Sequence, residues 1–300
     1  MKYSRKLLLF GFSIVAGVGA LASFSRAQQG PAPSFRSITG GVYWMEGGAA
    51  VNVGAIVGKD GVIVIDAKTS AAAGKQILAE IAKITPLPVT TVILTDGDVD
   101  HSYGLAGFPK GLTIIAQENT KKDLEATANS ARPAPQLPNK AVDKKESLSI
   151  NGVRMVLLHY QPAHTSGDLM VYLPDQKIAF TGDIISNTCC GNVRKEQTLT
   201  LIKSNEGGSA AGWIETMKKL LALNADTYVP GHGPLQTKDD VHARLSRVDE
   251  RRAQVKKMAA EGKSLAEIKQ ALNETTPPGY DVAQFPDLTT VMYNEVTQKH

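Results

Sequence analysis

The chain has 300 residues, of which 42% are hydrophobic and 21% charged, and its formal net charge is +4 at neutral pH. This length and hydrophobic content predict a folded globular domain with a substantial core and exclude a low-complexity chain. The whole net charge comes from the first 27 residues, because removing their four basic residues from the total of 33 leaves 29 against 29 acidic residues. A near-neutral remainder gives no electrostatic reason to expect a nucleic acid or an anionic membrane as partner.

Residues 1–27 have the pattern of a secretory signal peptide. Residues 1–6 are basic, residues 7–22 are apolar, and Ser25-Arg26-Ala27 supplies small residues for cleavage. We therefore expect export to the periplasm or the cell exterior, cleavage after Ala27, and no membrane attachment of the mature protein. An uncleaved membrane anchor is the alternative.

Residues 28–40 are polar and Pro-rich and are predicted to form a flexible lead-in. Period-2 alternation and turn residues then predict strands at residues 42–45, 51–57, 62–66, 90–94 and 112–116, and a set of strands within 147–180. Helical periodicity predicts helices at residues 70–84, 118–129, 210–223, 238–261, 265–272 and 288–296. Two strand-rich halves, each followed by helices, indicate one α/β domain over residues 41–300, a sandwich of two sheets with helices outside.

Four segments run from a strand-like apolar stretch into side chains that can bind a metal. These side chains are Asp96, Asp98, Asp100 and His101 in the first segment, and then His164, Asp183 and His232. A strand carries its last side chains to one edge of a sheet, so four neighbouring strand ends can surround a metal with imidazoles and carboxylates. The ordered set is typical of a metallohydrolase.

The first of these segments also resembles the start of a helix–loop–helix calcium site. That interpretation fails because its sixth position requires Gly and has His101, while its twelfth requires Glu and has Gly107. In an extended loop, alternate residues share a side. We therefore expect Asp96, Asp98 and Asp100 to converge on one region and His101 to turn toward a neighbouring one.

The ordered motifs resemble those of the metallo-β-lactamase superfamily, which has His-x-His-x-Asp-His after a strand, then a His, a bridging Asp and a final His. The resemblance runs from residues 42–66 to Pro230-Gly231-His232-Gly233. Two segments within it are close to the family's sequence motifs: residues 162–168 and Thr181-Gly182-Asp183. It implies a four-layer αββα sandwich, a small-molecule substrate and two divalent metal ions. The chain differs at Asp96 and Asp98, where the family pattern has histidines.

The resemblance implies two metal positions and a bridging carboxylate: Asp96, Asp98 and His164 at the first position, Asp100, His101 and His232 at the second, and Asp183 between them. Carboxylates are harder ligands than imidazoles, so the first position should favour Mn²⁺, Fe²⁺ or Mg²⁺. Zinc is nevertheless expected overall, because the second position has its complete set of ligands. Four close carboxylates need compensation, which two cations would supply. A single metal at the second position, with Asp96 and Asp98 holding water or a substrate amine, remains open.

These observations predict an exported metal-dependent hydrolase in which a metal-bound hydroxide attacks a carbonyl or phosphoryl centre, with an amide, lactam, ester or thioester as substrate. Asp100 is expected to orient the nucleophile and carry its proton. Carboxylate ligands make a bound water less acidic, so we expect an alkaline pH optimum. A binding protein with a degenerate first metal position and an iron-dependent oxidoreductase are the alternatives. No motif indicates the particular substrate or the oligomeric state.

Several other polar residues have simpler explanations. Asn52 and Asp66 end strands, where turn chemistry is sufficient, although support of the metal ligands is an alternative. Asp168 either supports His164 or forms a cap or turn. The only cysteines, Cys189 and Cys190, are neighbours, so they cannot cross-link distant segments; a vicinal disulfide, an intermolecular bridge and free thiols remain open.

Overall fold

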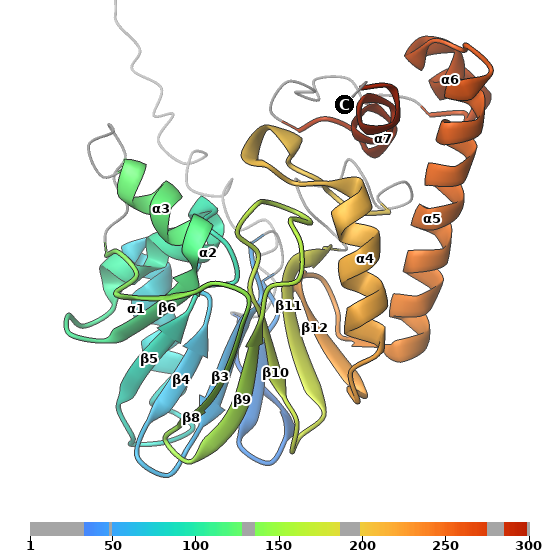
Figure 1. Ribbon diagram of the computed structural model, residues 1–300. Helices are drawn as coiled ribbons and strands as arrows, with labels where there is room; N and C mark the ends of the chain where they lie inside the picture. Colours follow the sequence, from blue (N-terminus) through green and yellow to red (C-terminus); the bar gives the residue numbers. More distant parts are fainter. Residues whose placement is uncertain (1–32, 48–49, 128–135, 187–198, 275–284, 299–300) are drawn as a thin grey trace, which may run out of the picture. The chain divides into compact units, whose positions relative to one another are not determined.

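Two β-sheets lie face to face, and helices cover the outer face of each sheet (Figure 1). The computed structural model describes residues 33–47, 50–127, 136–186, 199–274 and 285–298. The predicted signal peptide and both cysteines lie outside these ranges. No helix in the described ranges combines the length and apolar character that crossing a bilayer requires.

The first sheet contains, among the described residues, seven strands in chain order: β1 (Arg36–Thr39), β2 (Val42–Met45), β3 (Val53–Val57), β4 (Val62–Ile65), β5 (Val89–Ile93), β6 (Thr113–Gln117) and β7 (Lys140–Val142). Strands β1 to β4 are antiparallel, and β4 to β7 are parallel. Strand β4 is the β-branched run Val-Ile-Val-Ile and is buried along its whole length, as expected of a strand covered on both faces.

Strand β1 corrects the predicted lead-in of residues 28–40. Arg36 pairs with Trp44 across the β1–β2 ladder, and the guanidinium of Arg36 lies 4.7 Å from the Trp44 ring centroid. The exposed, polar sequence of β1 lacks the apolar alternation by which a strand is predicted, because this edge strand is held by its ladder rather than by burial. Ordered structure therefore begins before residue 41.

The second sheet contains, within the described ranges, six strands in the order β13-β12-β11-β10-β9-β8. Their bounds are β8 (Lys145–Ile150), β9 (Val153–Leu158), β10 (Met170–Leu173), β11 (Ile178–Ser186), β12 (Thr227–His232) and β13 (Gln236–Thr237). The β11–β12 pair is parallel and the other pairs are antiparallel. Both parallel strands carry a predicted metal ligand, Asp183 in β11 and His232 at the end of β12.

The described helices are α1 (Ala71–Ile81), α2 (Val99–Ser102), α3 (Glu118–Ala126), α4 (Ala210–Leu221), α5 (Lys238–Ala260), α6 (Leu265–Ala271) and α7 (Leu288–Thr297), with 3-10 turns η1 (Tyr103–Gly107) and η4 (Ser204–Glu206). Their ends follow local capping chemistry. The Ser70 side chain accepts from Ala73 N at the start of α1, and Thr237 with Asp240 forms a capping box at α5. The long helices therefore begin within one residue of their predicted starts.

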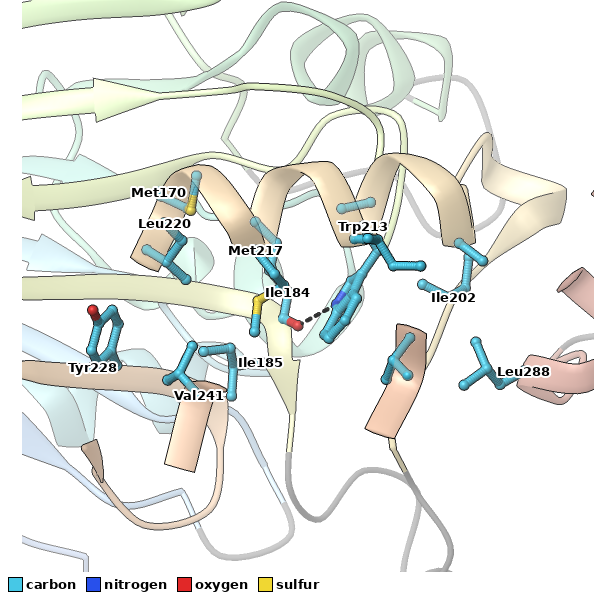
Figure 2. Close-up of a cluster of buried hydrophobic side chains, with 14 of the residues drawn as sticks. Met170, Ile184, Ile185, Ile202, Trp213, Met217, Leu220, Tyr228, Val241 and Leu288 are labelled. Carbon is cyan, nitrogen blue, oxygen red and sulfur yellow. Dashed lines mark hydrogen bonds between the residues drawn. The ribbon is translucent and has the colours of Figure 1, made fainter. Parts of the chain in front are cut away.

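Three hydrophobic clusters define four layers. The central cluster joins Trp44 and Ile93 of the first sheet to Leu157 and Phe180 of the second. One outer cluster packs α1, η1 and α3 on the first sheet, and the other packs α4, α5 and α7 on the second. Figure 2 shows the latter, with Trp213 of α4 donating from Nε1 to the Ile184 carbonyl at 2.7 Å. The predicted αββα sandwich is confirmed.

Candidate metal centre

Asp183 in β11 is the hub of the site, and the three predicted histidines lie around it. Its Oδ1 lies 3.5 Å from His232 Nε2 and 3.8 Å from His101 Nε2, and its Oδ2 lies 3.8 Å from His164 Nε2. All four side chains are buried. Residues up to 131 positions apart in the chain, from His101 to His232, therefore meet at one edge of the two sheets.

The predicted second metal position is compact. Asp100 Oδ2 lies 3.1 Å from His232 Nε2. Asp100, His101 and His232 each offer one ligand atom, and these atoms all lie within 4.8 Å of one another. This set of two imidazoles and one carboxylate suits Zn²⁺ and related divalent ions.

The predicted first metal position is less complete. Asp98 Oδ2 lies 3.6 Å from His164 Nε2, so these two predicted ligands face each other. Asp96 makes different contacts: its Oδ1 accepts from Asp98 N at 2.9 Å, and its Oδ2 lies 3.4 Å from Nδ1 of His101. That is the opposite ring nitrogen from the one that faces Asp183. The role of Asp96 as a metal ligand stays a prediction.

The expectation of an extended loop over residues 96–101 was wrong. Residues 99–102 form the helical turn α2, because the Asp98 carbonyl accepts from both His101 N and Ser102 N at 3.0 Å. This turn places Asp100 and His101 together at the second position, while Asp98 precedes the turn and faces His164. The alternation rule fails since it applies only to extended backbone.

The electrostatics of the site require positive charge. Five buried atoms of the predicted ligands have no hydrogen-bond partner among the described residues: Asp96 Oδ2, His101 Nε2, His164 Nε2, Asp183 Oδ1 and His232 Nδ1. Burial acts to lower the pKa of His164, but the neighbouring Asp98 and Asp183 carboxylates raise that pKa to about 10. The pKa of His101 is also raised, against burial, by Asp96 and Asp66. Protons or a metal cation would supply this charge, and unpaired ring nitrogens facing a carboxylate fit a divalent cation.

The outer ring nitrogens of two histidines are held by acceptors, which fixes the tautomer. His164 Nδ1 lies 2.9 Å from the Leu201 carbonyl, which can only accept. His101 Nδ1 lies 2.9 Å from Thr95 Oγ1, whose own proton goes to Asp66 Oδ2 at 2.8 Å. In the neutral ring each Nδ1 therefore carries the proton, which leaves the Nε2 lone pair facing the centre, as metal ligation requires.

Asp66 supports the site beyond turn chemistry. Its carboxylate accepts from Thr95 N and Thr95 Oγ1, both at 2.8 Å, and lies 3.2 Å from His101 Nδ1. The residue is buried and has a φ of 63°, an uncommon conformation for a residue other than Gly. The alternative of a supporting role for Asp66 agrees with this geometry.

Asn52 and Asp168 hold the loops that carry His232 and His164. Asn52 Nδ2 donates to the carbonyls of Pro230 and Gly233 at 2.9 and 2.8 Å, so it spans the turn containing His232. Asp168 accepts from Ala163 N at 3.1 Å and from Thr165 N at 2.9 Å, on either side of His164. Asn52 acts on backbone groups that only the folded chain brings near it, whereas Asp168 acts within its own loop, so for Asp168 a turn and support of His164 are the same contacts.

Lys203 is a site residue that the sequence did not reveal. Its Nζ lies 2.6 Å from Asp98 Oδ1 and 2.5 Å from Glu206 Oε1, and its side chain is 7% exposed. Despite burial, these two carboxylates raise the pKa of Lys203, so it is a permanent cation. No motif surrounds it, and no local signal could have identified it.

A cleft of about 910 Å³ opens onto the centre. Its described walls include the apolar side chains Val99, Leu124, Leu201 and Phe285 and the acidic side chains Asp98, Asp100, Asp123, Asp183 and Glu206. Lys203 and His232 are the basic side chains among the described lining residues. The cleft is large enough for a small organic molecule.

Comparisons with known proteins agree with this fold. The 2,4-dinitroanisole O-demethylase subunit alpha of Nocardioides sp. (strain JS1661) is 28% identical over 182 residues, covering 59% of this chain and 51% of that protein. The sec-alkylsulfatase Pisa1 from Pseudomonas sp. superposes with a TM-score of 0.69 at 15% identity, covering 88% of this chain and 50% of that one. A metallo-beta-lactamase from Pontibacter korlensis gives 0.60 at 19% identity, covering 72% and 99%.

The chain spans about half the length of the curated relatives it matches. The sequence profile of the metallo-beta-lactamase superfamily matches residues 47–232, well over half of the chain, and this range includes every predicted metal ligand. The chain therefore belongs to the metallo-beta-lactamase superfamily, whose members are mostly metal-dependent hydrolases and typically bind divalent metal ions.

Proposed function

We propose that this protein is an exported hydrolase that uses a divalent metal, most readily zinc, to cleave an uncharged amide, lactam, ester or thioester. The observation that carries the proposal is the convergence of His101, His164 and His232 on Asp183, with two unpaired ring nitrogens facing that carboxylate. The cleft beside it gives a substrate access to the same groups. Metal-dependent hydrolase-type chemistry is also what the relatives share.

Asp100, His101, His232 and Asp183 would hold the metal. When bound, a divalent cation supplies Lewis acidity, which lowers the pKa of a water molecule and polarises a carbonyl. Burial acts to raise the pKa of Asp100, but the hydrogen bond from His232 lowers it below its usual range. Asp100 is thus ionised at neutral pH, lines the cleft, and can orient an entering water and accept its proton.

The charge of the cleft favours an uncharged substrate. Five acidic side chains, Lys203 and His232 line the described part of the cleft, so one divalent cation with His232 as a neutral ligand would still leave it negative. An anionic group such as a sulfate ester would be repelled there. Apolar walls at Leu124, Leu201 and Phe285 instead suit an uncharged acyl compound with a hydrophobic portion.

Elemental analysis and turnover, measured on one preparation of residues 28–300, test the proposal. We expect at least one equivalent of zinc, hydrolysis of a chromogenic lactam, an aryl ester or a thioester, and loss of turnover after chelation. Zinc should restore it. Asp100→Asn should lower turnover by about 10²-fold or more, since loss of a general base typically costs 10²–10⁴-fold. Metal binding without turnover on any acyl class would instead support a binding protein.

Export is a separate part of the proposal and rests on residues 1–27. Expression of the full chain in a Gram-negative host, followed by fractionation and N-terminal sequencing, tests it. We expect soluble periplasmic protein that begins at Gln28. Full-length protein retained in the membrane fraction would instead support the uncleaved anchor.

A further inference from the structure

We propose that the ammonium group of Lys203 replaces the first metal ion, so that the centre holds one divalent cation, at the position formed by Asp100, His101 and His232. The inference rests on the metal-dependent function proposed above and concerns the number and place of its metals. It chooses between the two-metal and the one-metal arrangement that the sequence leaves open.

The ion pair between Lys203 and Asp98 occupies the first position. Lys203 Nζ lies 2.6 Å from Asp98 Oδ1, and the two side chains are 7% and 21% exposed, so solvent screens the pair little. A carboxylate oxygen that accepts from an ammonium group has less capacity to bind a metal. Only Oδ2 of Asp98 then faces His164 Nε2, at 3.6 Å.

The backbone around Lys203 is tied to the His164 loop, which makes the ammonium group a built part of the site. Lys203 N donates to the His164 carbonyl at 2.8 Å, and the Lys203 carbonyl accepts from Glu206 N and Gly208 N, both at 2.9 Å. A Cβ at Gly208 would lie 2.2 Å from the His164 carbonyl oxygen, so this close approach requires glycine. These contacts therefore fix the position of the Lys203 backbone relative to that of His164.

The remaining predicted ligand of the first position, Asp96, does not replace the Asp98 oxygen that Lys203 occupies. Asp96 Oδ1 accepts from Asp98 N, and its Oδ2 lies 3.4 Å from His101 Nδ1 without a hydrogen-bond partner; among the described residues no ion pair joins Asp96 to His164. A divalent ion between Asp98 and His164 would also lie close to the ammonium group, and the two like charges would repel each other in a poorly solvated site. Among the residues that the structure describes, no lysine or arginine is ion-paired to Asp100, His101 or His232, so none of them presents the same obstacle at the second position.

Metal counting on the wild-type protein tests the inference directly. Residues 28–300 are loaded with excess Zn²⁺, desalted, and analysed for metal and protein. We expect one zinc ion per chain. Two per chain would overturn the inference and leave the metal-dependent hydrolase intact, whereas none would overturn both.

Two alanine variants locate the single ion. His232→Ala should lose it, seen as at least a 100-fold rise in the Kd for Zn²⁺ by calorimetry, whereas His164→Ala should retain one equivalent. The reverse pattern would place the ion at the first position and overturn the inference. This measurement does not depend on any change at Lys203.

Variants of Lys203 test the replacement itself. Lys203→Met should raise the metal content from one to two per chain, because it frees Asp98 Oδ1 and removes the repelling charge. Lys203→Arg keeps a cation and should remain at one, as should Lys122→Met, which removes an exposed lysine paired with Glu118. A folded Lys203→Met protein that still binds one ion would contradict the replacement; if that variant does not fold, the wild-type count decides.

Discussion

Asn52 is a buried residue that supports a predicted ligand without facing it. Its side-chain amide spans the turn around His232, with two donated hydrogen bonds at 2.8 and 2.9 Å and one accepted from Gly47 N at 2.8 Å. Each of the three partners is a backbone group. Loss of this amide would leave them without the partners that hold the turn.

We therefore expect Asn52→Ala to lower the free energy of unfolding by about 1–3 kcal/mol, the cost of leaving buried polar groups unsatisfied. Metal affinity should fall with it, because His232 loses its support. Urea denaturation and zinc calorimetry measure the two effects. Asn205→Ala, at an exposed position, is the control and should change stability by less than about 0.5 kcal/mol. Equal stabilities of the two variants would contradict the role of Asn52.

Gly231 is required by the close approach of β12 to Asp183. A Cβ at this position would lie 2.0 Å from Asp183 Oδ1 and 2.9 Å from Asp183 N. Gly231→Ala must therefore displace the carboxylate at the hub of the site. We expect the Kd for zinc to rise about 10–100-fold, as for other changes that misorient ligands. Gly40→Ala, where no atom lies within 4 Å of the added Cβ, should leave zinc affinity unchanged.

At the scale of elements, α4 supports the metal centre from behind. Trp213 in α4 is fully buried and donates from Nε1 to the carbonyl of Ile184, the residue after Asp183 in β11 (Figure 2). Packing of this helix thus helps to fix the strand that carries the hub. The outer helical layer contributes to the site although none of its side chains is a predicted ligand.

Trp213→Phe removes this hydrogen bond while keeping an aromatic ring. We expect a loss of about 1–3 kcal/mol in unfolding free energy, since the Ile184 carbonyl loses its side-chain partner, and a weaker zinc affinity. Trp213→Ala should cost more, about 3–5 kcal/mol, because it also leaves a cavity. Chemical denaturation measures both. Glu215→Ala, on the exposed side of α4, is the matched control, and a similar loss there would contradict a specific role for Trp213.

Local sequence properties explain which helices and strands could be predicted. Helices α1, α4, α5 and α7 match their predicted starts because capping and periodicity are local properties. Turn α2 and strand β1 were not predicted. A four-residue turn is too short for a period, and β1 is an exposed edge strand with no alternating apolar face.

For the whole molecule, the buried histidines couple stability to pH and metal. In the metal-free protein the carboxylates raise the pKa of His164 from 6.5 to about 10. A raised folded-state pKa contributes stability that is fully present below the unfolded value and is lost as the pH rises through the folded value. His101 and His232, whose pKa values are also raised, act in the same direction.

We therefore expect the metal-free protein to lose thermal stability between about pH 6.5 and pH 10. The zinc-loaded protein should not show this loss, because zinc needs neutral imidazole and binds more tightly as protons leave. Thermal midpoints measured across this range, with and without a chelator, check both expectations. His164→Ala should reduce the slope of the metal-free protein. A metal-free stability that rises over this interval would contradict the charge arrangement.

The sequence by itself determined the layered fold and the convergence of the predicted ligands on one edge of the sheets: Asp98, Asp100, His101, His164, Asp183 and His232. Both could be predicted because periodicity, caps and strand-end motifs are properties of short stretches of sequence. Only the tertiary structure decided the support of His232 by Asn52, the turn of Asp96 toward Nδ1 of His101, and the pairing of Lys203 with Asp98 across 105 residues. Such contacts depend on which loops the folded sheets bring together. No local pattern encodes that information.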